Sequence, residues 1–180
     1  MMRVIDGEVG EFGVLYERYK RPLYGYFFKL TRGDQASSED LVHTVFYKAL
    51  RYRKSFKGTG SFAKWIFSIA HNTGIDHHRK ASQVIPDNEY TEFQAGYFVN
   101  DDLERSESLG ILNKAMALLD RNDLEILLLG KIRELHYSEI ADITGSTENA
   151  VKTRICRALK KLKAIYVKLE TTKYERERLK

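Results

Sequence analysis

The chain has 180 residues, of which 43% are hydrophobic and 31% charged, and its net charge is +5. This apolar content suffices for one domain or two small ones, which excludes wholesale disorder, and the basic balance suits a polyanionic partner. A single cysteine, Cys156, excludes an internal disulfide and any multi-cysteine metal site. No run of about 18 apolar residues or signal-peptide hydrophobic region is present, so we expect a cytoplasmic protein that is not membrane-embedded.

The first third of the chain predicts two helices in succession. Apolar residues recur at helical spacing over residues 12–30, and Gly33 with the following aspartate interrupts the pattern. Ser37 or Ser38 is expected to cap a second helix, which carries apolar residues on one side over positions 41–49. The spacing is helical throughout, so the predicted class is all-α.

A basic, glycine-containing loop leads into a third predicted helix. The loop covers residues 51–60, and Ser61 is placed to cap a helix with an apolar side over residues 62–73. Together these helices predict a first domain at residues 8–80.

The composition changes over residues 81–108, where no helical stripe is visible. This segment carries seven acidic residues and one arginine, a net charge of −6, which leaves +11 on the remainder because the whole chain carries +5. We expect a flexible acidic linker between two domains. Its acids, among them Asp101, Asp102 and Glu104, are hypothesised to occupy basic faces of the free protein through charge complementarity.

Residues 109–172 predict a second helical domain that contains a helix-turn-helix. Ser138 is expected to cap the first helix of the motif, and Ser146 or Thr147 the second. Glycine in the turn can adopt the left-handed conformation that ends a helix. Three residues stand at offsets of four and six, the spacing of a DNA-binding helix-turn-helix: Ala141, Gly145 and Val151.

The second helix of this motif has two different faces. At about 100° per residue, six apolar residues fall on the side expected to pack inward: Val151, Ile155, Ala158, Leu159, Leu162 and Ile165. Hydrogen-bonding and cationic residues fall opposite or on the flanks: Asn149, Lys152, Thr153, Arg154, Arg157 and Lys160. This arrangement favours DNA recognition over an ordinary solvated helix.

Two parts of the chain resemble extracytoplasmic-function RNA polymerase sigma factors. Residues 38–50 and 60–79 resemble region 2 of that family, and the most specific residues are Phe62, Trp65, Ile66, Ile69, Ala70, Asn72, Asp76 and Arg79. The Glu-Ile-Ala at 139–141 and the Val-Lys-Thr-Arg at 151–154 resemble region 4. The resemblance implies an alternative sigma factor that binds core RNA polymerase, recognises and melts promoter DNA, and starts transcription.

The resemblance also implies a polymerase-binding surface on the second helix. The residues expected on its outer face are Glu39, Asp40, His43, Thr44 and Tyr47. The family usually has glutamine and then an acid at the positions of His43 and Thr44. Because this chain departs from that pattern, Glu39 and Asp40 are expected to supply the polar groups that contact polymerase.

The basic loop and the third helix correspond to the family's reader of the minus-ten promoter element. Positive side chains can follow a phosphate backbone, and a pocket for an extruded base would trap the melted state. The residues expected to contact this strand are Arg53, Lys54, Lys57, Lys64, Ser68, His71, Asn72 and Arg79. Trp65 is expected to pack in the core rather than to stack on a base.

Region 4 implies contacts with duplex DNA at the minus-thirty-five element. The residues expected to make them are Ser146, Thr147, Asn149, Lys152, Thr153, Arg154 and Arg157. The family also implies a regulatory partner, an anti-sigma protein.

Two other classes of function stay open from the residues alone. One is a helix-turn-helix regulator that binds an inverted repeat unaided, and the other is a protein-interaction module that does not touch DNA. No phosphate loop, nucleophile elbow or paired-acid motif is present, so we expect no enzymatic activity and no cofactor. The histidines at 71, 77 and 78 have no partners at convincing ligand spacing, so no metal site is expected.

Overall fold

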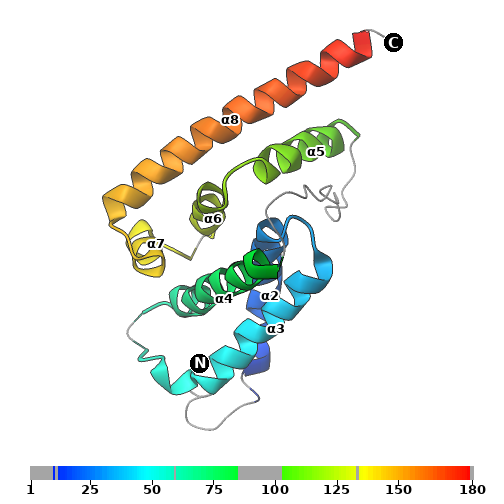
Figure 1. Cartoon of the computed structure of the whole chain (residues 1–180). Helices are drawn as coiled ribbons and strands as arrows, with labels where there is room; N and C mark the ends of the chain where they lie inside the picture. Colours follow the sequence, from blue (N-terminus) through cyan, green and yellow to red (C-terminus); the bar gives the residue numbers. More distant parts are fainter. Residues whose placement is uncertain (1–9, 11, 59, 85–102, 133, 179–180) are drawn as a thin grey trace.

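The computed structural model describes residue 10 and residues 12–58, 60–84, 103–132 and 134–178. Within those ranges the chain is helical and contains no strand, which confirms the predicted all-α class. The first unit consists of α2 (Phe12–Leu30), α3 (Gln35–Arg51), the short 3-10 helix η2 (Arg53–Ser55) and α4 (Phe62–Val84). The second unit consists of α5 (Leu103–Ala117), α6 (Arg121–Gly130), α7 (Tyr137–Thr144) and α8 (Glu148–Arg178). Figure 1 shows α8 running the length of the second unit, with α2, α3 and α4 gathered on the opposite side of α6 and α7.

The start of α3 differs from the expectation. Asp34, and neither Ser37 nor Ser38, caps this helix, because its side chain accepts a hydrogen bond from the backbone N–H of Ser37 at 3.1 Å. Ser38 is instead fully buried, and its hydroxyl bonds the side chain of Thr31 at 2.9 Å. Gly33 has a φ of 95°, which is why glycine stands at the turn between α2 and α3. Aspartate and serine cap helices equally well, but α3 begins at Gln35, so Ser37 and Ser38 already lie inside the helix.

The helices α2, α3 and α4 enclose the core of the first unit. Leu23 and Phe27 of α2, Val45 of α3, and Ile66 and Phe67 of α4 are fully buried. They stand three or four residues apart on each helix, so each helix presents one apolar side to the other two. The expected cap of α4 is confirmed: the hydroxyl oxygen of Ser61 accepts the backbone N–H of Lys64 at 3.1 Å.

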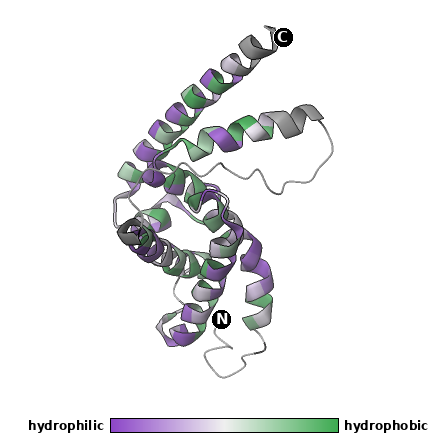
Figure 2. Cartoon of the chain, turned by 45° about the vertical axis from the view of Figure 1, so that its right-hand side comes forward, coloured by the Kyte–Doolittle hydropathy of each residue, from purple (hydrophilic) through white to green (hydrophobic). Residues whose placement is uncertain are grey.

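The second unit has a smaller core between α8 and the three shorter helices. Ile126, Leu129, Ile140, Val151 and Ala158 are buried there. The side chain of Asp120 caps α6 by accepting the N–H of Asp123 at 2.9 Å. Figure 2 shows hydrophilic residues recurring along the coloured part of α8, as expected for a helix that packs on one side only.

Helices extend into both ends of the segment expected to be a linker. α4 continues through Val84 and α5 begins at Leu103, so helix covers the first four and the last six residues of the 81–108 segment. The first turn of α5 is rich in charge, which explains why no apolar stripe marked it in the sequence. Residues 85–102, including Asp101 and Asp102, and the side chain of Glu104 lie outside what the structure describes.

The two units pack against each other in a single arrangement. α4 contacts α7, and α2 contacts α6. Buried residues of both units join in one continuous hydrophobic cluster. Consequently some of the residues predicted to bind DNA lie near the boundary between the units.

Candidate functional site

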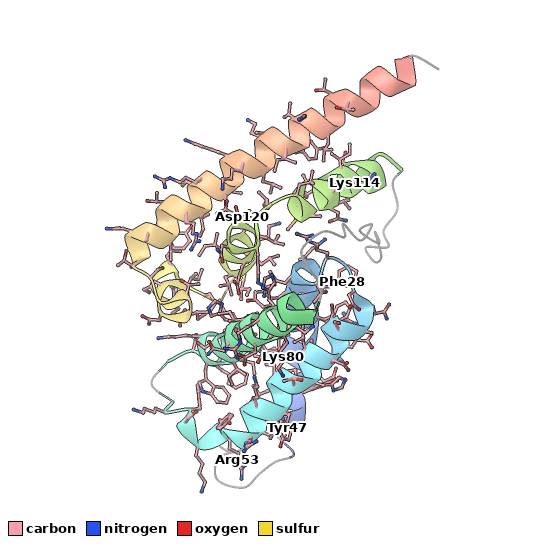
Figure 3. All side chains as sticks on the ribbon, viewed as in Figure 1. Phe28, Tyr47, Arg53, Lys80, Lys114 and Asp120 are labelled. Carbon is pink, nitrogen blue, oxygen red and sulfur yellow. The ribbon has the colours of Figure 1, made fainter. Side chains whose placement is uncertain are left out.

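The outer face of α3 presents most of the residues predicted to bind polymerase. Glu39, Asp40, His43 and Tyr47 are exposed, Tyr47 to 63%. Thr44 is half-buried, so it contributes less to this face than expected. Figure 3 shows Tyr47 on the part of the first unit that lies away from α8. The structure therefore leaves this surface accessible while the two units are packed together.

The cationic side chains of the basic loop after α3 differ in their exposure. Lys54 and Lys57 are exposed, as expected for residues that follow a phosphate backbone. Arg53 is half-buried and donates a hydrogen bond from Nη1 to the carbonyl of Leu50 at 3.0 Å. Its Nε is buried without a hydrogen-bond partner. Arg53 thus contributes to the end of α3 as well as to the charge of the loop, which its sequence position did not reveal.

An aromatic cluster joins this loop to the start of α4. The ring of Phe56 lies 5.8 Å from that of Phe62 and 5.5 Å from that of Trp65, between centroids. The indole N–H of Trp65 donates to the hydroxyl of Ser55 at 3.3 Å. Trp65 is half-buried and packs against the core, in line with its expected packing role. The cluster holds the basic loop against the N-terminus of α4.

The predicted DNA face of α4 is only partly exposed. Asn72 and Arg79 are exposed, and Arg79 pairs with Asp76 of its own helix at 3.3 Å. Ser68 is half-buried, and its hydroxyl donates to the carbonyl of Lys64 at 2.8 Å. Lys64 and His71 are also half-buried, and both contact carboxylates of the second unit. The structure brings these last two residues to the boundary between the units rather than to solvent.

Glu125 of α6 is the centre of a buried polar network at that boundary. Its Oε1 lies 2.8 Å from Nδ1 of His71 and accepts the hydroxyl hydrogen of Tyr26. Burial opposes ionisation of this carboxyl, but hydrogen bonds with His71 and Tyr26 outweigh it and hold the pKa of Glu125 below its usual value. The pKa of Tyr26 is raised well above 10 by burial and by Glu125. Glu125 is therefore a carboxylate that three helices share.

A second carboxylate joins the units beside α2. Glu134 accepts hydrogen bonds from Arg18 at 2.6 Å and from the hydroxyl of Tyr19 at 2.5 Å. These bonds, first that of Tyr19 and then that of Arg18, lower the pKa of Glu134. Burial and the bond to Glu134 raise the pKa of Tyr19.

A glycine of α4 permits a further contact between the units. Arg121 donates from Nη2 to the carbonyl of Gly74 at 2.9 Å. A Cβ atom at position 74 would lie 3.2 Å from that Nη2, so glycine gives the guanidinium its close approach.

The turn of the helix-turn-helix forms as predicted, but its first cap does not. Gly145 has a φ of 62° and ends α7 in the left-handed conformation. Thr147 precedes α8 and accepts the N–H of Ala150 at 3.3 Å, which confirms one of the two expected caps. Ser138 lies inside α7, so its predicted capping role is wrong. Glu139 instead accepts the backbone N–H of His136 at 2.9 Å and closes the first turn.

The N-terminal part of α8 presents the residues predicted to contact duplex DNA. All seven are exposed: Ser146, Thr147, Asn149, Lys152, Thr153, Arg154 and Arg157. Lys152 forms an ion pair with Glu148 one turn earlier at 2.6 Å. Val151 and Ala158 are buried on the opposite side, but Leu159, expected to be inward, is 52% exposed. Leu159 stands at the edge of the apolar face, where helical spacing alone does not decide burial.

The sequence did not single out Glu125, Glu139, Asp142 and Arg121. The one available signal was an acid within an apolar run, Leu124-Glu-Ile-Leu, which often marks a buried and paired carboxylate. No residue spacing links the second unit to α4, because the contacting residues are more than forty positions apart.

Other kinds of site find no support in the part of the chain that the structure describes. No group of three or more His, Cys, Asp and Glu side chains there is arranged to hold a metal ion. None of the described helices is long and apolar enough to cross a membrane.

Comparison with known proteins assigns both units. The family model described as Sigma-70 region 2 matches residues 15–84, and the one described as Sigma-70, region 4 matches residues 109–162. The chain is 30% identical over 157 residues to "RNA polymerase sigma factor YlaC" of Bacillus subtilis (strain 168), which covers 83% of this chain and 88% of the relative. It is 28% identical over 155 residues to "ECF RNA polymerase sigma factor SigM" of the same bacterium, with 84% and 93% covered.

A solved structure shares the fold. It is the sigma factor RpoE in complex with the anti-sigma factor NepR from Bartonella quintana, with a TM-score of 0.70, 22% identity, and 86% of this chain and 96% of that chain covered. With both regions matched and a relative at 30% identity over most of both chains, the chain belongs to the extracytoplasmic-function group of sigma-70 factors and is an alternative sigma factor that directs transcription initiation.

Proposed function

We propose that the first unit binds core RNA polymerase and the melted minus-ten strand, and that the second unit binds the minus-thirty-five duplex. The first unit corresponds to the domain predicted at residues 8–80, and the second unit to the domain predicted at residues 109–172. The observation that supports this most directly is the N-terminal face of α8, where seven hydrogen-bonding and cationic side chains are exposed around a capped helix start. Such a helix fits the major groove with its first turns at base edges.

Within that face we assign two kinds of contact. Asn149 and Thr153 are short, uncharged and near the N-terminus, so they face base edges. Lys152, Arg154 and Arg157 supply positive charge for phosphates on either side of the groove. The partly positive N-terminus of the helix adds to that attraction.

In the first unit, two different surfaces carry the two roles. Glu39, Asp40, His43 and Tyr47 on α3 form the polymerase contact, with a half-buried Thr44 at its edge. Lys54 and Lys57 in the loop, with Asn72 and Arg79 on α4, contact the melted strand. Each DNA contact is weak by itself, and polymerase makes the pair specific because it sets their separation.

The proposed setting is the cytoplasm, with core polymerase and promoter DNA as partners and no catalytic activity of the chain itself. An anti-sigma protein is a further proposed partner, since the similar RpoE was solved with one.

An initiation assay tests this proposal. Core polymerase from the source bacterium is incubated with and without the protein on the DNA upstream of its own gene, and specific transcripts are mapped. We expect a defined start only when the protein is present. Protection of an inverted repeat by the protein alone, with no effect on polymerase, would support the regulator alternative instead.

Variants on α8 separate DNA binding from protein interaction. Arg157→Ala should reduce initiation, whereas Lys163→Ala, an exposed cation further along the same helix, should not. If substitution of both Lys152 and Arg157 leaves initiation unchanged, the proposed minus-thirty-five contact is wrong and the interaction-module alternative gains support.

A further inference from the structure

Two of the seven exposed residues at the start of α8 already use their side-chain hydroxyls within the protein. The hydroxyl oxygen of Ser146 lies 3.1 Å from that of Thr144, so one of these hydroxyls donates to the other. The hydroxyl oxygen of Thr147 accepts the backbone N–H of Ala150 at 3.3 Å. Both side chains therefore stabilise the turn and the first turn of the helix.

Lys152 also has partners within the protein, on the side of α8 that is next to α7. Its Nζ lies 2.6 Å from a carboxylate oxygen of Glu148 and 6.0 Å from the centre of the ring of Tyr137, the first residue of α7. An ammonium group near an aromatic face is attracted by the ring. These two contacts keep the charge of Lys152 on the flank of α8, where phosphates rather than base edges lie when a helix occupies the major groove.

Asn149 has no such partner and lies at the middle of the exposed face of α8. Its side chain is exposed, and its amide makes no hydrogen bond within the part of the chain that the structure describes. At about 100° per residue, it falls within about 30° of the direction opposite the buried Val151 and Ala158. Lys152 and Arg157 fall about 70° to either side of that direction. Asn149 therefore lies between two cations, where a helix in the major groove meets the base edges.

The amide of asparagine is complementary to one kind of base edge. It carries a donor NH₂ group and an acceptor oxygen side by side. In the major groove, adenine presents the acceptor N7 beside the donor N6, whereas guanine presents two acceptors, cytosine a donor, and thymine an acceptor beside its methyl group. Because only adenine pairs with both groups of the amide at once, asparagine at this position distinguishes adenine from the other three bases.

We propose that Asn149 is a specificity-determining residue of this sigma factor and selects an adenine in the minus-thirty-five element through hydrogen bonds to N6 and N7. This contact rests on the proposed binding of α8 to duplex DNA, and it names a base that the helix requires. Thr153 is one turn further along, about 6 Å along the helix axis, and faces a base about two steps away. A threonine contacts several kinds of base, so Asn149 makes the sharper selection.

Initiation from a series of altered promoters tests this selection. Core polymerase and the protein are incubated with the DNA upstream of its own gene, in which each base pair of the mapped minus-thirty-five element is replaced in turn by the other three. For the wild type we expect one position at which replacement of an adenine lowers initiation about 5- to 150-fold, the effect of losing a contact with two hydrogen bonds. Asn149→Ala should be indifferent to the base at this position and keep the wild-type preferences at the others.

A second variant should change the preferred base rather than abolish the preference. Asn149→Asp keeps the shape of the side chain but removes its donor, so the carboxylate accepts from N4 of cytosine and is repelled by N7 of adenine. The preferred base at this position should therefore change from adenine to cytosine. Ratios between templates are compared within each variant, which cancels a uniform loss of affinity from the added negative charge. The matched control is Asn122→Asp, the same substitution at the exposed second residue of α6, and it should keep the preference for adenine.

Thermal melts check that every variant is folded. Wild-type base preferences at every position in both Asn149→Ala and Asn149→Asp would overturn the selection of adenine, and so would an equal loss of initiation from every template. A position that depends on Asn149 but prefers a base other than adenine would overturn it as well. Absence of initiation by the wild type from any template would instead count against the proposed function, so the two failures are distinguishable.

Discussion

His71 of α4 and Glu125 of α6 meet at the boundary between the two units, with 2.8 Å between Nδ1 and Oε1, and the same carboxylate oxygen accepts the hydroxyl hydrogen of buried Tyr26. One acid thus connects three helices. Because Glu125 is buried, water has little access to the groups that contact it and cannot readily replace their hydrogen bonds to the carboxylate.

Removing this carboxylate should destabilise the protein. Glu125→Ala leaves the hydroxyl of Tyr26 and the ring of His71 without their acceptor, and we expect the free energy of unfolding to fall by about 1–3 kcal/mol. Urea unfolding of the full chain measures it. Glu148→Ala, at an exposed acid of α8, serves as the control and should change stability by less than about 0.5 kcal/mol. Equal losses in both variants would contradict a special role of Glu125.

Contact between the units should weaken in acid. The pKa values of Glu125, Glu134 and Glu139 are all lowered in the folded protein, so their contribution is complete above the ordinary value near 4.5 and is lost as the pH falls through the lowered values. Glu125 faces His71 of α4, Tyr26 of α2 and Arg121 of its own helix.

Spin labels on the exposed native Cys156 of α8 and on Ala36→Cys of α3 check this dependence, with their separation measured by pulsed electron paramagnetic resonance between pH 7 and pH 3. We expect the fraction of molecules whose two units have separated to rise below about pH 4.5, as the carboxylates become protonated. Glu134→Gln should already be more open at pH 7 and change less in acid. A closed fraction that is constant over this range would show that these acids do not hold the units together.

The cap of α3 should make a measurable contribution to stability. Asp34→Ala removes the acceptor for the N–H of Ser37, and caps of this kind contribute about 0.5–2 kcal/mol. Asp34→Asn keeps a side-chain oxygen and should retain most of the stability. Thermal denaturation distinguishes the two variants, and equal melting temperatures would argue against the cap.

Two glycines should respond to alanine in opposite directions. Gly145→Ala forces a side chain into the left-handed conformation at φ 62° and should cost about 1 kcal/mol, although space is available. Gly25→Ala lies within α2, also with nothing within 4 Å of a Cβ atom, and should stabilise by about 0.5–1 kcal/mol. If the urea midpoints of Gly145→Ala and Gly25→Ala move in the same direction, the requirement for glycine in the left-handed turn is refuted.

The recognition helix should contribute to the salt dependence of promoter binding. Arg157→Ala removes one proposed phosphate contact, so the slope of log affinity against log salt should fall in magnitude by about 0.9 for polymerase that carries the variant. Lys163→Ala should leave the slope unchanged. Filter binding at four salt concentrations measures both, and equal slopes would place Arg157 away from DNA.

Local features were predictable because short-range chemistry decides them. Helical spacing marked α2, α3 and α4, and the requirement for a left-handed residue marked the turn at Gly145. The errors lay where neighbouring residues compete for one local role: Asp34 rather than a serine caps α3, and Glu139 rather than Ser138 closes the first turn of α7. The exposed Leu159 was a similar error at the edge of a helix face.

The sequence by itself determined the all-α class, the family, and the exposed recognition face of α8, because periodicity, turn residues and motif spacing are local properties. Only the tertiary structure decided that Lys64 and His71 are covered, since their partners Asp142 and Glu125 are distant in sequence. Neither periodicity nor charge count specifies which acid meets which base across a boundary. That choice depends on how two folded units pack, and here the packing placed carboxylates on the side of α4 that was predicted to contact DNA.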